Sequence, residues 1–183
     1  MALTKAEKSV LDTIAYAEGT LGVSNNGYDV IVTFKTINGW TKDTKIVHGG
    51  SDWLQKVGDS KSAAAGRYQF LPDTWKSLNG GVNVPLTKDN QDNACINLIK
   101  KKLLDTKSID SRSVTIEELP NDKSKFDIFL QKCAPTWASL PLTKDVIING
   151  VTKKAGNGFY SNQGGKKTAQ ELYDVFMLAY GKY

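Results

Sequence analysis

The chain has 183 residues, of which 40% are hydrophobic and 23% charged, and this is the composition of a globular domain rather than of a disordered or fibrous protein. Its formal charge of +5 favours an anionic partner, such as nucleic acid, acidic lipid or a bacterial wall polymer, without choosing among them. No apolar run approaches membrane-spanning length and no signal-peptide pattern is present, so we expect synthesis in a cytoplasm without stable membrane insertion.

The first predicted element is a helix within the stretch from Leu3 to Gly19. Thr4 and Glu7 have the spacing of a capping box, so the helix should begin there, and apolar residues recur at helical spacing up to Glu18. Gly19 follows directly, which fits a left-handed stop at the helix C-terminus. Burial and the carbonyl end of the helix dipole both disfavour an anion, so we expect a raised pKa for Glu18, which suits a general acid. The alternative interpretation is that Glu18 is a solvated helix end.

A small β-hairpin is predicted next. Residues 28–34 are rich in β-branched and aromatic side chains, which favours a strand. Asn38-Gly39 has the turn chemistry of a hairpin, with residues 40–47 as the returning strand. The Gly-rich loop that follows favours a surface position for His48, the only histidine of the chain, so neither a zinc site nor a histidine-activated nucleophile is indicated.

The rest of the chain is predicted to be mainly helical. A short helix around residues 73–75 ends at the break 79–81, and longer helices cover residues 88–104 and 122–133. Thr168 and Glu171 repeat the capping-box spacing at the start of a last helix. The two cysteines, Cys95 and Cys133, lie on apolar helix faces, which favours buried thiols, and a single disulfide stays open.

The order of helix, hairpin and further helices indicates an α+β fold, with a helical lobe, a small β-hairpin lobe and a cleft between them. We expect one domain over residues 1–183. A cleft beside a carboxylic acid suits a polysaccharide site, because glycosidic cleavage needs a group that protonates the leaving oxygen. Hydrolysis would need a second carboxylate, for which Asp29 and Asp52 are candidates, although aspartates in such positions are more often turn or surface residues.

Five blocks of sequence, taken in order and in approximate spacing, resemble the phage lambda-type endolysins. They are Ala15–Thr20, Gly27–Val32, Ala65–Phe70, Gln91-Asp92 and Cys133–Pro141. The resemblance implies a lysozyme-like α+β fold and cleavage of bacterial peptidoglycan between N-acetylmuramic acid and N-acetylglucosamine. It also implies lytic transglycosylase chemistry, in which the muramic C6 hydroxyl closes onto C1 and a single glutamate, here Glu18, acts as acid and then as base.

The resemblance also points to residues that contact the substrate. The Gly-x-x-Gln stretch of lytic transglycosylases is similar to the one ending at Gln69, which implies sugar contact by Gln69 and Tyr68; interlobe packing of Tyr68 and a helix cap by Gln69 are the alternatives. Tyr160 and Gln163 lie in a Gly-containing loop that we expect to line the cleft. Trp53, in a loop, is the tryptophan best placed to be a sugar platform.

The prediction is therefore a cofactor-free, metal-free and monomeric peptidoglycan lytic transglycosylase with no nucleic-acid partner. Glu18 is its catalytic residue, and the predicted substrate-binding residues are Asp29, Trp53, Tyr68, Gln69, Tyr160 and Gln163. A hydrolysing muramidase that uses Asp29 or Asp52 is the first alternative. A non-catalytic wall-binding virion component is an alternative of another class. For the enzyme, release through a membrane lesion and carriage on the virion both stay open.

Overall fold

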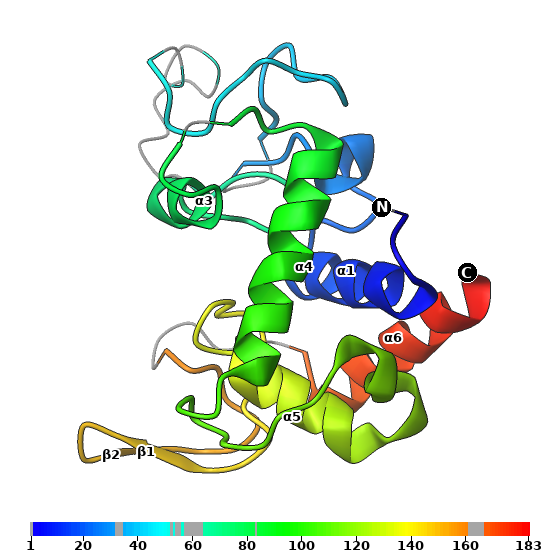
Figure 1. Ribbon diagram of the computed structural model, residues 1–183, viewed down its shortest axis with the longest axis vertical. Helices are drawn as coiled ribbons and strands as arrows, with labels where there is room; N and C mark the ends of the chain where they lie inside the picture. The colour runs from blue at the N-terminus through cyan, green and yellow to red at the C-terminus, as the bar shows by residue number, and fades with distance from the viewer. Residues whose placement is uncertain are drawn as a thin grey trace. The chain divides into compact units, whose positions relative to one another are not determined.

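The computed structural model describes residues 2–31, 35–51, 53, 56, 64–82, 84–160 and 167–183. Figure 1 shows its elements, which in chain order are α1 (Lys5–Ala17), η1 (Ser24–Gly27), α3 (Pro72–Leu78), α4 (Lys88–Leu104), η3 (Ile116–Asn121), α5 (Lys123–Cys133), β1 (Val146–Ile148), β2 (Val151–Lys153) and α6 (Ala169–Lys182). The chain forms two compact units: the terminal unit, Met1–Ala17 with Ile99–Tyr183, and the middle unit, Glu18–Leu98. No helix in the described ranges is long and apolar enough to cross a bilayer.

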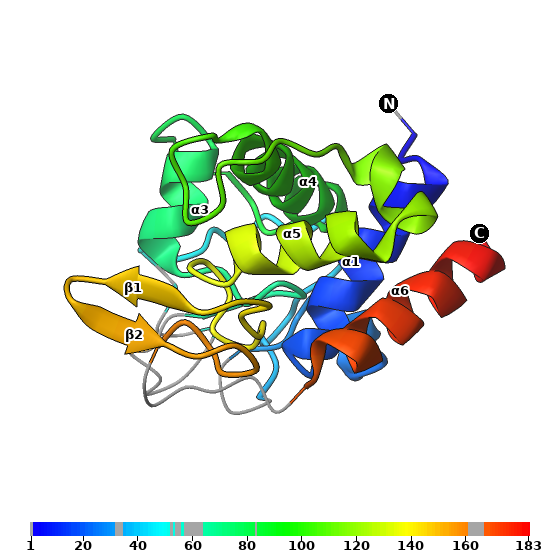
Figure 2. The same ribbon diagram turned by 90° about the horizontal axis from the view of Figure 1, so that it is seen from below.

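The terminal unit is built on α1, α5 and α6, of which α1 and α6 begin at the caps that the sequence predicts. The Thr4 amide donates to the Glu7 carboxylate at 2.8 Å and the Glu7 amide to the Thr4 hydroxyl at 3.1 Å, and Thr168 and Glu171 form the same capping box before α6. α6 lies along α1, as Figure 2 shows. The core of this unit is formed by apolar side chains of α1, η3, α5 and α6, which include Val10, Ile14, Leu119, Phe126, Phe129, Leu130, Leu172 and Phe176.

The other predicted helices are also present. α4 begins after Thr87, whose hydroxyl accepts the Asn90 amide at 3.2 Å. α5 begins after Asp122, whose carboxylate accepts the Ser124 amide at 2.8 Å. α3 ends where Gly80 takes a φ of 68°, a left-handed conformation that glycine adopts without strain. α4 contributes residues to both units, because the boundary at Leu98 falls within it.

A two-stranded antiparallel sheet lies in the terminal unit, in a segment for which the sequence predicts a Gly-containing loop. β1 and β2 pair with Ile148 opposite Val151, so that Asn149 and Gly150 form a two-residue connection. These two residues have φ angles of 50° and 77°, the positive values that a type I′ turn requires and that Asn-Gly supplies. The turn chemistry that predicts a hairpin at Asn38-Gly39 therefore operates at Asn149-Gly150.

The predicted hairpin over residues 28–47 is wrong in its pairing. Val30 forms an antiparallel bridge with Thr36, whereas Val47 forms one with Pro85. In the part of the chain that the structure describes, residues 40–47 therefore do not pair with residues 28–31. Val47 pairs with Pro85, just before α4. This partner is distant in sequence, so the local turn chemistry of Asn38-Gly39 does not predict it.

The Asn38-Gly39 pair does make a turn, in which the Trp40 amide donates to the Ile37 carbonyl at 3.2 Å. The Trp40 ring then stacks on Tyr28, with ring centroids 6.1 Å apart, and its indole N–H donates to the Leu86 carbonyl at 2.8 Å. These side-chain contacts lead the chain from the turn toward the start of α4. Tertiary packing thus overrides the local hairpin signal.

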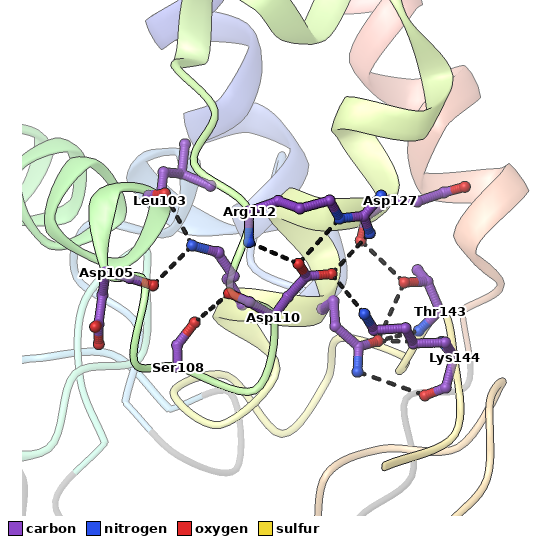
Figure 3. Close-up of polar contacts among 10 residues, drawn as sticks. Leu103, Asp105, Ser108, Asp110, Arg112, Asp127, Thr143 and Lys144 are labelled. Atoms are coloured by element: carbon purple, nitrogen blue, oxygen red, sulfur yellow. Dashed lines mark hydrogen bonds and ion pairs between the residues drawn. The ribbon is translucent and has the colours of Figure 1, made fainter.

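A polar network anchors the segment before β1 (Figure 3). The buried Asp110 carboxylate accepts hydrogen bonds of 2.7 to 3.0 Å from Arg112 and pairs with Lys144 at 2.9 Å. The Gln131 amide oxygen, on α5, accepts the backbone amides of Thr143 and Lys144 at 2.7 and 3.1 Å. Thr143 and Lys144, which precede the hairpin of β1 and β2, are therefore attached to α5 by contacts that do not involve the two strands.

The end of α4 is capped by a buried lysine from α5. The Lys132 ammonium donates to the Leu103 and Asp105 carbonyls at 3.0 and 2.8 Å, which satisfies acceptors that the helix leaves open. Burial lowers the pKa of Lys132. A positive charge at a helix C-terminus also has favourable interaction with the helix dipole.

Candidate active site

Glu18 is the first residue after α1 and is half-buried. Gly19, which follows it, has a φ of 74°, so the helix ends in the left-handed conformation that the sequence predicts. The chain leaves the helix axis directly after the carboxylate. Glu18 therefore lies at the beginning of the middle unit, at the point where regular helix gives way to loop.

Thr20 connects this segment to the loop that carries the predicted sugar-binding residues. Its hydroxyl, which is 1% exposed, donates to the Arg67 carbonyl at 2.6 Å. Gly27 packs on the other side of Thr20, and a Cβ at Gly27 would lie 2.7 Å from the Thr20 carbonyl oxygen. Only glycine fits there, and its φ of 87° requires glycine as well. The backbone beside Glu18 is thus fixed against two other segments of the middle unit.

The predicted sugar-binding loop is a tight turn closed by Ala65 and Phe70, which exchange two backbone hydrogen bonds of 3.0 Å. Gln69 has a φ of 48°, unusual for a residue with a side chain. Its amide nitrogen donates to the Gly66 carbonyl at 2.8 Å and to the Val30 carbonyl at 3.2 Å. Gln69 is half-buried and does not cap a helix; its side chain instead braces the turn on which it lies.

Tyr68 does not meet the surface, and its predicted direct contact with substrate is therefore corrected. The side chain is 0% exposed, and its hydroxyl donates to the Asp92 carboxylate of α4 at 2.5 Å. Tyr28 donates to the same carboxylate at 2.8 Å. Burial, followed by the charge of Asp92, raises the pKa of Tyr28 to about 12 and that of Tyr68 well above its usual value, so both phenols are protonated donors at neutral pH.

Asp29 is also buried, at 4% exposed, so the prediction that it contacts substrate is not supported by its position. Its Oδ2 accepts the Ser24 hydroxyl at 3.0 Å and the Asn25 side-chain amide at 2.7 Å. Asn25 and Asn26 take left-handed φ angles of 45° and 54° in the loop that wraps this carboxylate. The interpretation of Asp29 as a turn aspartate, left open by the sequence, fits these contacts.

Trp53 and His48 lie together inside the middle unit, and two predictions are corrected here. Trp53 is 6% exposed and packs on the His48 ring, with centroids 4.5 Å apart, so it offers no open platform to a sugar. His48 is 4% exposed rather than on the surface, and its Nε2–H donates to the Phe70 carbonyl at 2.7 Å. The loop that carries His48 is folded back on the Ala65–Phe70 turn, a long-range contact without a local signal.

Tyr160 is 47% exposed in the terminal unit, and its hydroxyl donates to the Pro135 carbonyl at 2.8 Å. It lines a cavity of about 310 Å³ together with residues of β2 and the following loop, including Val151, Lys153 and Asn157. The aromatic ring therefore has an accessible face, and its predicted place in a substrate cleft stays a prediction. Gln163 and Asp52 lie outside the described residues.

Gln91 and Asp92, one of the five blocks of the family resemblance, have no role predicted from the sequence, but their side chains contact the turn that carries Gln69 and the segment at Tyr28. Both side chains are buried on α4, and they fall on the same stripe of the helix as Cys95. The sequence signal that could have indicated their burial is the position of two consecutive polar residues at the start of an apolar helix face. Among the described residues, no group of three or more His, Cys, Asp or Glu could hold a metal ion. Cys95 and Cys133 are both buried, as predicted.

A family model described as Endolysin matches residues 8–167, which is most of the chain. The chain belongs to the endolysin family. As an endolysin, the protein is a peptidoglycan-cleaving enzyme of the phage lysis type. The matched range includes residues of both units and every residue of the predicted site.

Solved structures give the same assignment of the fold. A bacteriophage lambda lysozyme complexed with a chitohexasaccharide is 21% identical, covers 98% of this chain and 96% of that chain, and has a TM-score of 0.56. A lysozyme from bacteriophage lambda is 23% identical, with the same coverage and a TM-score of 0.55. These likenesses confirm the lysozyme-like α+β fold of this endolysin. A search of curated proteins found no match.

Proposed function

We propose that this endolysin is a lytic transglycosylase that cleaves the β-1,4 bond between N-acetylmuramic acid and N-acetylglucosamine. Glu18 protonates the glycosidic oxygen as the bond to C1 breaks. The carboxylate then accepts the proton of the muramic C6 hydroxyl, whose oxygen bonds to C1 and gives a 1,6-anhydro end. One carboxyl group thus returns to its starting state without water.

The observation that carries this proposal is the place of Glu18, half-buried at the end of α1 and two residues before Thr20, whose hydroxyl is bonded to the Gln69-bearing turn. The raised pKa that the sequence predicts for Glu18 stays a prediction. The hydrogen bond of Thr20 ties that segment to the turn that carries Gln69. The reaction needs at least an acid and a polar group that orients the sugar, and we propose Glu18 and Gln69 for these roles.

The state of Asp29 favours the transglycosylase over the hydrolysing alternative. A base that activates water must be open to that water, whereas Asp29 is 4% exposed and holds the Ser24 and Asn25 side chains. Asp52, the other candidate, lies outside the described residues. A mechanism with one carboxylate requires neither of them.

The proposed substrate is an N-acetylated glycan strand of peptidoglycan. The structurally similar lambda lysozyme complexed with a chitohexasaccharide supports a β-1,4-linked N-acetyl sugar chain as ligand. Because the Gln69 amide nitrogen already donates twice, its amide oxygen is the atom left to accept a hydrogen bond, as from a sugar N–H or O–H. Tyr160, with an exposed ring, is proposed to contact the same polymer. We further propose that the enzyme acts as a monomer.

Replacing Glu18 tests the proposal. Glu18→Gln keeps the shape of the side chain but removes the proton that is transferred, and we expect the release of soluble glycan fragments from purified sacculi to fall by about 10²- to 10⁴-fold. Glu117→Gln, at an exposed glutamate, is the matched control and should leave the rate unchanged. A fully active Glu18→Gln enzyme would refute the mechanism. Loss of activity in Asp29→Asn, with reducing muramic ends in the wild-type products, would favour hydrolysis instead.

A further inference from the structure

We propose that Gln91 and Asp92 are positioning residues that hold Gln69 in its sugar-binding orientation. This inference rests on the proposed function, because it assigns a role within the same site. Both residues lie on α4, and their side chains are 0% and 4% exposed, so neither touches a ligand itself. All of the contacts that support the inference are within the middle unit.

Gln91 fixes the backbone of two segments at once. Its amide oxygen accepts the Arg67 amide at 2.9 Å, and its amide nitrogen donates to the Tyr28 and Leu86 carbonyls at 3.0 and 2.9 Å. A Cβ at Gly66 would lie 2.2 Å from the Gln91 amide oxygen, so the turn is pressed directly against this side chain. A buried side chain whose donors and acceptor are all used this way has one position available to it.

Asp92 fixes side chains of the same two segments. Its carboxylate accepts the Tyr68 hydroxyl at 2.5 Å, the Tyr28 hydroxyl at 2.8 Å and the Lys88 ammonium at 2.7 Å. Tyr28 belongs to the segment that continues to Val30, and Tyr68 is the neighbour of Gln69. One buried carboxylate with three donors therefore sets the distance between the two segments.

These two segments are the ones that orient Gln69. Its amide nitrogen donates to a carbonyl of each, Val30 at 3.2 Å and Gly66 at 2.8 Å. Its backbone holds a φ of 48°, which persists in a residue other than glycine only where the surroundings enforce it. Movement of either segment would turn the amide oxygen of Gln69 away from its present direction. Gln91 and Asp92 on α4 therefore set the direction of the Gln69 amide oxygen.

A double-mutant cycle between Tyr68 and Gln69 tests the inference. Tyr68→Phe keeps the ring and removes one donor to Asp92, and we expect KM for soluble glycan strands to rise by about five- to tenfold while kcat changes less than about twofold. In a Gln69→Ala background the same change should raise KM by less than about twofold, because the side chain that it positions is gone. Equal effects in the two backgrounds, or no effect in either, would overturn the inference.

The controls separate positioning from general loss of stability. Tyr183→Phe removes another tyrosine that donates to a carboxylate, that of Asp12 at 2.9 Å in the terminal unit, and it should leave KM unchanged. If Tyr68→Phe does not fold, Tyr28→Phe removes the other phenol from Asp92 and gives the same comparison. Glycan affinity measured in a Glu18→Gln background reports the coupling between Tyr68 and Gln69 in the absence of catalysis. The result of the double-mutant cycle is therefore independent of whether the enzyme is a transglycosylase.

Discussion

Asp110 shows how one buried carboxylate can organise a loop. It is 3% exposed, and hydrogen bonds from Arg112 are the main cause that lowers its pKa, with Lys144 adding to the effect and burial opposing it. Because the pKa is lower in the folded state than in the unfolded chain, the carboxylate stabilises the fold at all pH values above its unfolded pKa of about 3.9. That contribution is lost as pH falls from there through the folded pKa.

We therefore expect Asp110→Asn to lower the free energy of unfolding by about 2 kcal/mol at neutral pH, as for other hydrogen bonds to charged groups. The deficit should shrink when the pH is taken below about 4, since the wild type then loses the same interaction. Urea unfolding of both proteins across this pH range measures it. Asp145→Asn, which breaks the exposed pair with Lys154, is the control and should lower the free energy of unfolding by much less than Asp110→Asn does. A deficit that does not depend on pH would contradict this explanation.

At the scale of the residue, the sequence predicts those properties of a side chain that depend on residues close to it in the sequence. Glu18 follows from capping and periodicity within one helix, and its position after α1 agrees. The burial of Trp53 and His48 depends on their contact with each other and with Phe70, whose place relative to them is decided by the whole middle unit. No local pattern distinguishes such a buried loop residue from an exposed one.

At the scale of the element, two Asn-Gly pairs have different outcomes. Asn149-Gly150 joins β1 to β2, while the turn at Asn38-Gly39 leads away from its expected partner. The helices were predicted closely because capping boxes and apolar stripes are read within one segment. Strand pairing requires a partner elsewhere in the chain, and it is here that the predicted hairpin failed.

Gly66 gives a prediction about the turn that carries Gln69. Gly66 and Gly39 both have positive φ, 77° and 73°, but a Cβ would meet Gln91 only at Gly66 and meets nothing within 4 Å at Gly39. Gly39→Ala should therefore cost only the left-handed strain, about 1–2 kcal/mol. Gly66→Ala should cost about 2 kcal/mol more, because it also displaces the buried Gln91 side chain. Chemical unfolding of the two variants makes the comparison, and equal losses would show that Gln91 yields freely.

At the scale of the whole molecule, charge is divided unevenly between the units. The middle unit has eight basic and eight acidic residues, whereas the terminal unit has sixteen basic and eleven acidic residues, so the net charge of +5 belongs to the terminal unit. The total alone could not reveal this division, because the terminal unit combines the two ends of the sequence. Because of this division, we expect the electrostatic attraction to an anionic wall to come from the terminal unit, whereas Glu18 belongs to the middle unit.

Adsorption to purified sacculi should therefore weaken at least about threefold when salt is raised from about 0.05 to 0.5 M, since screening shortens the range of these charges. Replacing the exposed Lys5 and Lys8 by glutamine should weaken adsorption more than replacing the exposed Lys42 and Lys45 of the middle unit. Binding measured by co-sedimentation gives both comparisons. Adsorption that is insensitive to salt would mean that contacts other than charge hold the enzyme on the wall.

The central claim is that a single carboxyl group, Glu18, completes the reaction without water. The masses of the glycan fragments released from sacculi by the wild-type enzyme test it most directly. The proposed mechanism predicts muramic ends in the 1,6-anhydro form, one water lighter than a reducing end and inert to borohydride. Fragments that carry reducing muramic ends would contradict it and would require a second carboxylate to activate water.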